Sequence, residues 1–307
     1  MSDSPQHTES SFRAPRYWPT WIGFSMLRFL SFLPFNTQLK LGRSVGRVAL
    51  RLAPKRAEVT RRNLRTCFPE HADEWIESTV TRHFENLGMG VFEMAMAWYR
   101  PQRLEGRWRF TGLEHLAANT PGPVILITGH FGALEVGGTA LKSEGLIFDA
   151  VYREDRSALV TELTRRGRER SGRRTIEKSN IKQMVRSLRD CITVWYAPDQ
   201  SYRRKHSAMI DFFGEPAMTN TATSTLAKLG RATVIGFYPH RRADFSGYDI
   251  EITVPLEPFP TEDSIDDTSR LVRQLEDQIR RSPDQYFWVH RKFKGRPERF
   301  ADIYADL

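Results

Sequence analysis

A histidine and a glutamate five positions apart are the first side chains whose types and spacing indicate chemistry. His130 and Glu135 lie in Gly129-His-Phe-Gly-Ala-Leu-Glu135, directly after the apolar run at residues 124–128. In one continuous helix, five residues at about 100° each would place the two side chains on different faces. If His130 instead lies in the turn before the helix, Glu135 can contact one imidazole nitrogen and make the other a general base. The alternative is a histidine whose ring is satisfied by backbone groups at a strand end.

Polar residues follow two other apolar runs in the same way. Arg153 comes after the run at 147–152, and Asp199 and Gln200 come after the run at 191–197. Ligands of open α/β sheets bind beyond the carboxyl ends of the strands. We therefore expect Arg153, Asp199 and Gln200 to bind or position a substrate, with a purely structural role as the alternative for each.

Several other chemistries lack their motifs. The chain has no Gly-x-Ser-x-Gly elbow, no phosphate-binding P-loop and no Gly-x-Gly-x-x-Gly sequence after a strand. Its two cysteines, Cys67 and Cys191, are in apolar contexts typical of inert thiols, and too few histidines and acids are closely spaced for a metal site. We therefore expect no metal, no cofactor and no covalent acyl-enzyme. What remains is direct transfer, in which His130 deprotonates a hydroxyl that attacks an acyl or phosphoryl donor.

The elements that would position these residues alternate along the chain. Apolar runs predict strands at 124–128, 147–152, 191–197, 233–238 and 248–254, and helical periodicity predicts helices at 131–143, 157–171, 180–189, 219–229 and 264–281. Helical spacing also covers residues 72–99. The alternation predicts an α/β fold with a mostly parallel central sheet flanked by helices.

The overall charge points to an anionic partner. The 307 residues include 46 basic and 37 acidic side chains, which gives a net charge of +9, and 37 of the bases are arginine. Arginine suits bidentate capture of phosphate and carboxylate. Phospholipid, nucleic acid, a phosphorylated metabolite and an acidic protein all fit this charge. The mean hydropathy of −0.50 excludes a polytopic membrane protein.

The N-terminal region predicts contact with a membrane. Residues 1–16 form a polar tail that we expect to be disordered, and residues 17–36 are rich in aromatics and interrupted by Arg28. We predict a membrane anchor at 17–36, either a marginal span or a helix in the interface; a helix packed on the protein is the alternative. Between Lys40 and Arg65 nine bases accompany one acid, which favours anionic headgroups on the cytoplasmic side. Residues 37–307 are then a single α/β domain with basic amphipathic helices at its start.

These segments together resemble the bacterial late acyltransferases of lipid A biosynthesis, within the lysophospholipid acyltransferase superfamily. The matching pieces extend over nearly the whole chain: the anchor region, Asn63-Leu-Arg-Thr-Cys-Phe-Pro69, Gly129-His130-x4-Glu135, Tyr152-Arg153, Pro198-Asp199-Gln200, Phe212-Phe-Gly-x-Pro216-Ala and Gln285-Tyr-x-Trp288-Val-His-Arg291-x-Phe-Lys294-x-Arg-Pro297. The last piece is the most specific of them.

The resemblance implies a glycerol-phosphate-acyltransferase-like fold and an enzyme at the cytoplasmic face of the inner membrane. It would transfer a fatty acyl chain from acyl carrier protein, its co-substrate, to the hydroxyl of a hydroxyacyl chain on a lipid A precursor. By resemblance, His130 is the base and Glu135 its partner. A lysophospholipid or another glycolipid is the alternative acceptor. A different class, a basic membrane-associated nucleic-acid-binding protein, has its main support in the arginine-rich residues 165–178. Three glutamates, Glu162, Glu169 and Glu177, lie in or just before that segment and speak against it.

Overall fold

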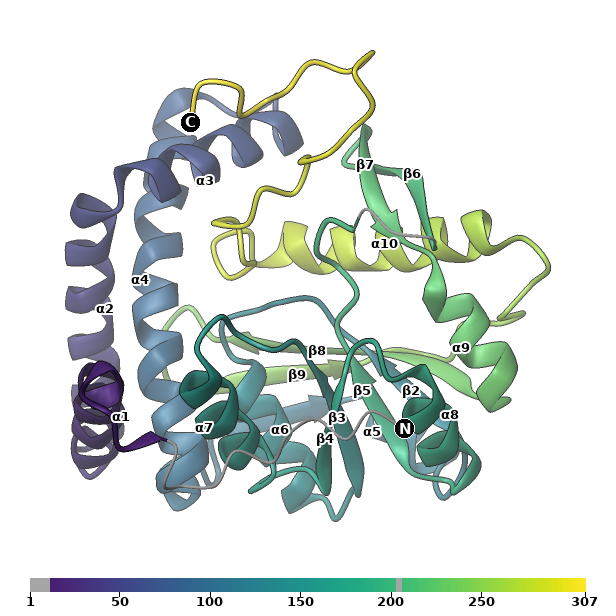
Figure 1. Cartoon of the computed structure of the whole chain (residues 1–307), viewed down its shortest axis with the longest axis horizontal. Helices are drawn as coiled ribbons and strands as arrows, with labels where there is room; N and C mark the ends of the chain where they lie inside the picture. Colours follow the sequence, from purple (N-terminus) through teal and green to yellow (C-terminus); the bar gives the residue numbers. More distant parts are fainter. Residues whose placement is uncertain (1–11, 203–205) are drawn as a thin grey trace.

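The core of the molecule is a seven-stranded sheet (Figure 1). The computed structural model describes residues 12–202 and 206–307. The strand order is β1-β9-β8-β2-β5-β3-β4, and every neighbouring pair is parallel except β8 and β9. The strands are β1 (Trp108–Thr111), β2 (Val124–Ile127), β3 (Phe148–Tyr152), β4 (Arg174–Glu177), β5 (Thr193–Tyr196), β8 (Thr233–Arg241) and β9 (Tyr248–Ile252). The predicted α/β fold with a mostly parallel sheet is therefore confirmed.

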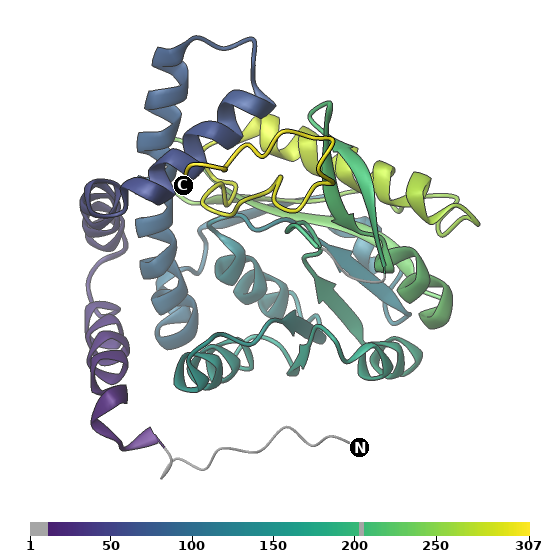
Figure 2. The same ribbon diagram turned by 45° about the horizontal axis from the view of Figure 1, so that its top comes forward.

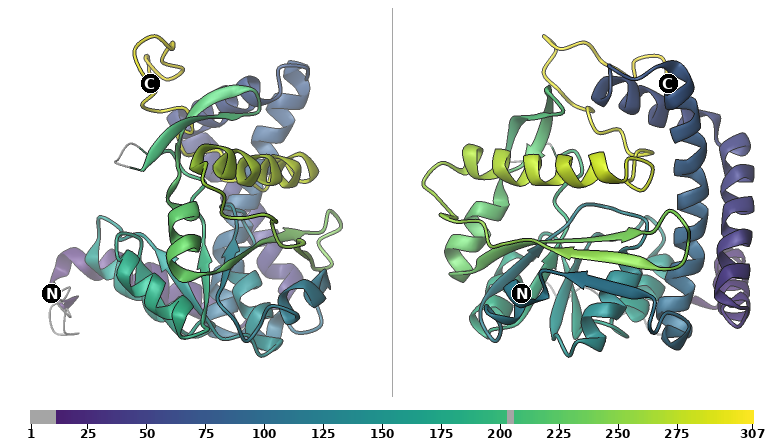
Figure 3. Two further views of the ribbon diagram at one scale, coloured as in Figure 1. Left: turned by 90° about the vertical axis from the view of Figure 1, so that its right-hand side faces the viewer. Right: turned by 180° about the vertical axis from the view of Figure 1, so that it is seen from behind.

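Helices cover both faces of this sheet because the central strands are apolar on both sides. Val124 and Leu126 of β2 pack with helix α6 (Leu134–Ser143) on one face. Ile125 and Ile127 face the other way, toward three helices. Those helices are α8 (Ile181–Arg189), α9 (Ala222–Gly230) and α10 (Ser264–Arg281). The short α5 (Leu113–Ala117) and α7 (Ala158–Arg168) complete the layer arrangement (Figures 1 and 3).

Four helices precede the sheet and stand at one side of it (Figures 1 and 2). After the 3-10 turn η2 (Pro15–Tyr17) they are α1 (Trp18–Leu30), α2 (Phe35–Leu52), α3 (Pro54–Cys67) and the long α4 (Asp73–Tyr99), which ends in the turn η3 (Pro101–Arg103). Helices α2 and α4 approach backbone to backbone through three glycines. A Cβ on Gly46 would overlap the carbonyl oxygen of Phe84, and one on Gly88 would overlap that of Gly42.

A hairpin and the C-terminal segment cover the end of the sheet at which the parallel strands finish. The hairpin pairs β6 (Ser207–Phe212) with β7 (Glu215–Asn220), and Phe213 and Gly214 turn with positive φ between them. The C-terminal segment after α10 passes from the sheet to α3, where the side-chain amide of Asn63 donates to the carbonyl oxygens of Trp288 and His290. Figure 1 shows this segment in yellow across the hairpin and α3.

The structure contains no single apolar anchor helix at residues 17–36, contrary to the prediction. Residues 17–36 are divided between α1, which ends at Leu30, and the start of α2 at Phe35, since Pro34 separates the two helices. None of the helices in residues 12–202 and 206–307 is long and apolar enough to cross a membrane. The predicted disordered tail at 1–16 lies mostly outside the described residues.

Candidate active site

Three neighbouring strands bring the predicted site residues to one edge of the sheet. β2 lies between β8 and β5, and β3 follows β5. His130 follows β2, Asp199 follows β5 and Arg153 follows β3. Because these strands are parallel, their carboxyl ends meet at the same edge, where ligands of such sheets bind.

His130 is paired with Asp199. The imidazole Nδ1 lies 2.5 Å from Oδ1 of Asp199, and the backbone N–H of His130 donates to Oδ2 at 2.9 Å. The two contacts fix both the ring and the loop of His130 against one carboxylate. The acid that sequence reasoning placed among the substrate-binding residues is thus the partner of the imidazole.

The surroundings of Asp199 keep its carboxylate charged. Burial alone would raise its pKa, but the charge and hydrogen bonds of His130 and the charge of Lys292 outweigh it and hold the pKa of Asp199 well below its usual range. A charged carboxylate accepts a hydrogen bond from Nδ1–H, so the lone pair of the neutral ring is on Nε2. The side chain of His130 is 34% exposed, whereas that of Asp199 is 2% exposed. The imidazole is therefore accessible and its partner is not.

The C-terminal segment after α10 binds the backbone of both His130 and Asp199. The ammonium group of the buried Lys292 donates to the carbonyl oxygen of Asp199 at 2.6 Å, and the N–H of Phe287 donates to the carbonyl oxygen of His130 at 2.9 Å. Burial lowers the pKa of Lys292, and the charge of Asp199 opposes that shift. Burial and the nearby Lys292 also lower the pKa of His290 to about 4, so its neutral Nε2 accepts from the N–H of Ser201 at 3.2 Å.

Glu135 has other partners than His130. One of its carboxylate oxygens accepts from Nε1 of Trp98 on α4 at 2.8 Å, and the other accepts from Nε of Arg168 on α7 at 2.9 Å. The expected contact between Glu135 and the imidazole is therefore not what the structure shows. His130 does lie in the loop before α6, but the first turn of α6 directs Glu135 toward Trp98 of α4 and Arg168 of α7, and Asp199 contacts the imidazole Nδ1 instead.

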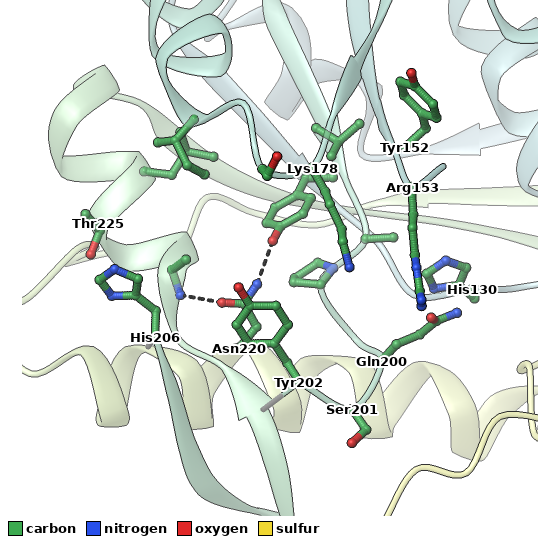
Figure 4. Close-up of a pocket in the computed structure, with 18 of the residues that line it drawn as sticks. His130, Tyr152, Arg153, Lys178, Gln200, Ser201, Tyr202, His206, Asn220 and Thr225 are labelled. Atoms are coloured by element: carbon green, nitrogen blue, oxygen red, sulfur yellow. Dashed lines mark hydrogen bonds between the residues drawn. The ribbon is translucent and has the colours of Figure 1, made fainter. Parts of the chain in front are cut away.

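A cavity of about 320 Å³ opens in front of His130. Figure 4 shows Arg153 and Gln200 beside His130 at one end of it and His206 at the other. Among residues 12–202 and 206–307, the side chains that line it include cationic, polar and apolar groups: Arg153, Arg168, Lys178, Tyr152, Tyr196, Tyr202, Asn220, Ile181 and Leu226. The hydroxyl of Tyr196 accepts from the side-chain amide of Asn220 at 2.7 Å. The cavity is thus lined by an imidazole, by cationic side chains and by apolar side chains.

The structure therefore groups most of the predicted residues and separates one. Arg153 and Gln200 line the cavity, Asp199 supports His130, and Glu135 reaches the cavity only through Arg168. Sequence reasoning missed Arg168, Lys178 and Lys292. The first two lie in the arginine-rich run 165–178, whose charge was visible but whose position was not. No signal in the sequence marks Lys292 as buried.

The arrangement can remove a proton from a bound hydroxyl and stabilise negative charge beside it. In the part of the chain that the structure describes, no three histidine, cysteine, aspartate or glutamate side chains are grouped so as to hold a metal ion. Neither Cys67, which is buried, nor Cys191 lines the cavity. Burial raises the pKa of Cys67 well above its usual value, which disfavours the thiolate.

Comparisons with known proteins agree with this chemistry. The family model described as bacterial lipid A biosynthesis acyltransferase matches residues 6–295. The lipid A biosynthesis lauroyltransferase of Escherichia coli K12 is 36% identical, with 94% of this chain and 96% of the relative covered. The palmitoleoyltransferase of the same organism is 35% identical over 95% and 96%, and its myristoyltransferase is 26% identical over 96% and 95%.

A solved structure of another acyltransferase is also similar to this chain. The 1-acyl-sn-glycerophosphate acyltransferase of Thermotoga maritima matches with a TM-score of 0.37 and 9% identity, covering 72% of this chain and 93% of that one. That similarity is too low to add to the argument. The family model and the relatives above 30% identity both extend over most of the chain. The chain belongs to the bacterial lipid A biosynthesis acyltransferases and is an acyltransferase enzyme.

Proposed function

We propose that this enzyme transfers a fatty acyl chain from acyl carrier protein to the hydroxyl of a hydroxyacyl chain on a lipid A precursor. The observation that carries the proposal is the pairing of His130 with the buried Asp199 at the mouth of a cavity lined by cations and apolar groups. Membership of the family supports the lipid A precursor as acceptor. The donor, the acceptor hydroxyl and the base are our proposals.

The chemistry follows from the pair. Nε2 of His130 accepts the proton of the acceptor hydroxyl while the oxygen attacks the carbonyl carbon of the thioester. The tetrahedral adduct then expels the thiolate, which takes the proton from the imidazolium. Asp199 holds the imidazolium in place and offsets its charge. The enzyme forms no bond to the acyl group, and no cofactor or metal enters the scheme.

The cations of the cavity match the negative charge of both the adduct and the acceptor. Arg153, Arg168 and Lys178 line the same cavity as His130. A phosphorylated glycolipid presents phosphate groups that arginine binds in a bidentate manner, and a developing oxyanion gains from a preorganised positive charge. Glu135 orients Arg168 through the 2.9 Å contact. We therefore assign Glu135 to positioning.

The test compares variants of the pair in detergent, with acyl carrier protein carrying the acyl chain. We expect His130→Ala and Asp199→Asn each to lower kcat by about 10²–10⁴-fold, because general-base catalysis contributes that much. His115→Ala, a histidine of α5 outside the cavity, is the matched control. Wild-type turnover in a folded His130→Ala protein would remove the proposed base. A preference for lysophosphatidic acid over a lipid A precursor would support the alternative acceptor.

We also propose that α1 and α2 lie on the cytoplasmic surface of the inner membrane, in its interface. Both helices present exposed apolar side chains at helical spacing: Trp18, Ile22, Met26 and Phe29 on α1, and Leu41, Val45, Val48 and Leu52 on α2. Exposed bases, including Lys40 and Arg51, accompany them. Aromatic and aliphatic side chains beside bases are typical of helices that bind anionic lipid surfaces.

A further inference from the structure

A second groove begins where the catalytic cavity ends. It has a volume of about 430 Å³ and lies between α8 and the end of α9, which are neighbours in Figures 1 and 2. Ile181 lines both the cavity and the groove. The remaining lining residues are apolar or charged: Val185, Leu229, Lys182, Arg186, Arg189 and Asp190. The groove is therefore an extension of the active-site entrance over the surface of α8.

The fold of α8 directs the bases outward. The side chain of Asn180 caps the helix by accepting from the N–H of Gln183. Met184 and Leu188 are buried against the sheet, so the opposite side of the helix faces solvent. Lys182, Arg186 and Arg189 are exposed there at spacings of four and three residues. They form one edge of the groove, and the partly exposed Ile181, Val185 and Leu229 form its floor.

The charge of this edge is available to a partner, unlike that of α7. On α7, Arg165 and Arg166 are bound to Glu162, and Arg165 also binds Glu169. Within residues 12–202 and 206–307, Lys182 and Arg186 have no carboxylate within 4.0 Å, and Asp190 is the one acid lining the groove. Two arginine-bearing helices that follow one another along the chain thus differ: the bases Arg165 and Arg166 of α7 are paired with glutamates, whereas Lys182 and Arg186 of α8 are not.

We infer that the groove between α8 and α9 is the docking surface for the acidic carrier protein that delivers the acyl thioester. This inference rests on the proposed function. An acidic helix of the partner would meet Lys182, Arg186 and Arg189, and its apolar side chains would contact Ile181, Val185 and Leu229. A partner seated there would hold its thioester arm at the entrance shared through Ile181. The groove lies at the opposite side of the molecule from α1 and α2 (Figures 1 and 2), so the partner and a membrane would not compete.

The test is the charge-reversed double variant Lys182→Glu/Arg186→Glu, assayed with two donors that carry the same acyl chain. With acyl carrier protein as donor we expect KM to rise about tenfold, which corresponds to about 1.4 kcal/mol of binding, with kcat little changed. With the acyl thioester of pantetheine, which lacks the protein, we expect KM and kcat to stay at wild-type values. Direct binding of the carrier protein to an immobilised enzyme should weaken by the same factor and depend less on salt.

The matched control reverses two exposed arginines away from the groove. Arg109 on β1 and Arg273 on α10 are exposed and do not line it. Arg109→Glu/Arg273→Glu should leave the KM and kcat for both donors, and the binding of the carrier protein, unchanged.

Unchanged binding of the carrier protein to the groove variant would overturn the inference and leave the proposed function intact. Equal loss with both donors, or loss of anionic vesicle binding without loss of carrier binding, would overturn it as well. A wild-type enzyme that transfers from neither donor would refute the proposed function, and the binding measurement would still decide on the groove.

Discussion

At the scale of residues, the site depends on which carboxylate contacts the imidazole and which contacts an arginine. Asp199 holds the imidazole of His130, and Glu135 holds the guanidinium of Arg168. The two acids differ in what surrounds them. Asp199 is buried between the imidazole and Lys292, whereas the second carboxylate oxygen of Glu135 accepts a hydrogen bond from Trp98. In the proposed mechanism the first pair supplies the proton acceptor, and the second places a positive charge in the same cavity.

The pairing of Glu135 with Arg168 predicts a non-additive effect of their substitution. Glu135→Gln and Arg168→Gln should each lower kcat/KM. The kcat/KM of the double variant should be no lower than that of the less active single variant, because both substitutions break the same ion pair. A double-mutant cycle then gives a coupling energy of about 0.5–3 kcal/mol. Glu162→Gln/Arg166→Gln, an ion pair of α7, is the control and should retain activity. Additive losses would mean that Glu135 acts separately from Arg168.

At the scale of elements, the sheet edge is assembled from strands that are distant in sequence. Apolar runs predicted β2 and β5, which are buried along their whole length. They also predicted β3, β8 and β9, although β3 and β9 each include an aspartate and β9 alternates buried residues with exposed or partly exposed ones. The limits of α10 were also predicted, since Asp263 caps its first turn. Both edge strands of the sheet, β1 and β4, were missed because each is only four residues long and carries polar residues. The hairpin β6–β7 was missed as well.

The pairing in the site was beyond sequence reasoning for a related reason. Glu135 is five residues from His130, whereas Asp199 is 69 residues away, so local spacing favoured the wrong carboxylate. Only the order of strands in the sheet, with β5 beside β2, shows that Asp199 is the neighbour. The residues after each strand could be identified as site residues, but which of them touch could not.

The contact between α2 and α4 predicts opposite effects of one substitution at two glycines. Gly→Ala in a helix usually stabilises by up to about 1 kcal/mol, and Gly23 of α1 has nothing within 4 Å of an added Cβ. At Gly46 the same methyl would overlap the backbone of α4. We expect Gly46→Ala to lower the free energy of unfolding by about 1–3 kcal/mol and Gly23→Ala not to lower it. Urea unfolding measures both, and equal effects would contradict close packing of the helices.

At the scale of the whole molecule, three surfaces are arranged around one sheet. Helices α1 and α2, which carry exposed apolar side chains, lie on one side of the molecule, and α8 and α9, which line the groove, lie on the other (Figure 1). The third surface is the cavity in front of His130, at the carboxyl ends of the parallel strands. The proposed transfer from a soluble protein donor to a lipid acceptor needs one surface for the donor and another for the acceptor. The positive charge is divided accordingly, with bases beside the apolar helices, around the cavity and along α8.

The exposed face of α1 predicts how the protein associates with lipid. Ile22→Asp/Phe29→Asp should reduce binding to vesicles of anionic phospholipid at least about tenfold, because it removes two large apolar side chains and adds negative charge. Ile147→Asp/Val254→Asp, equally exposed positions elsewhere, should not reduce it. Co-sedimentation measures the bound fraction. Full binding by the α1 variant would show that another surface meets the lipid.

The glycine contact of α2 with α4 has a consequence for the reaction at a surface. Helix α4 links α2 to the site. Its Gly88 contacts the backbone of α2, its Gly90 lies against Gly132 in the loop after His130, and its Trp98 donates a hydrogen bond to Glu135. Two backbones in direct contact leave no layer of side chains that could rearrange between them. A protein resting on a bilayer through α1 and α2 would therefore carry its imidazole at one constant height above the lipid. An acceptor hydroxyl that reaches this height would contact the base, and a hydroxyl that stays deeper in the bilayer would not.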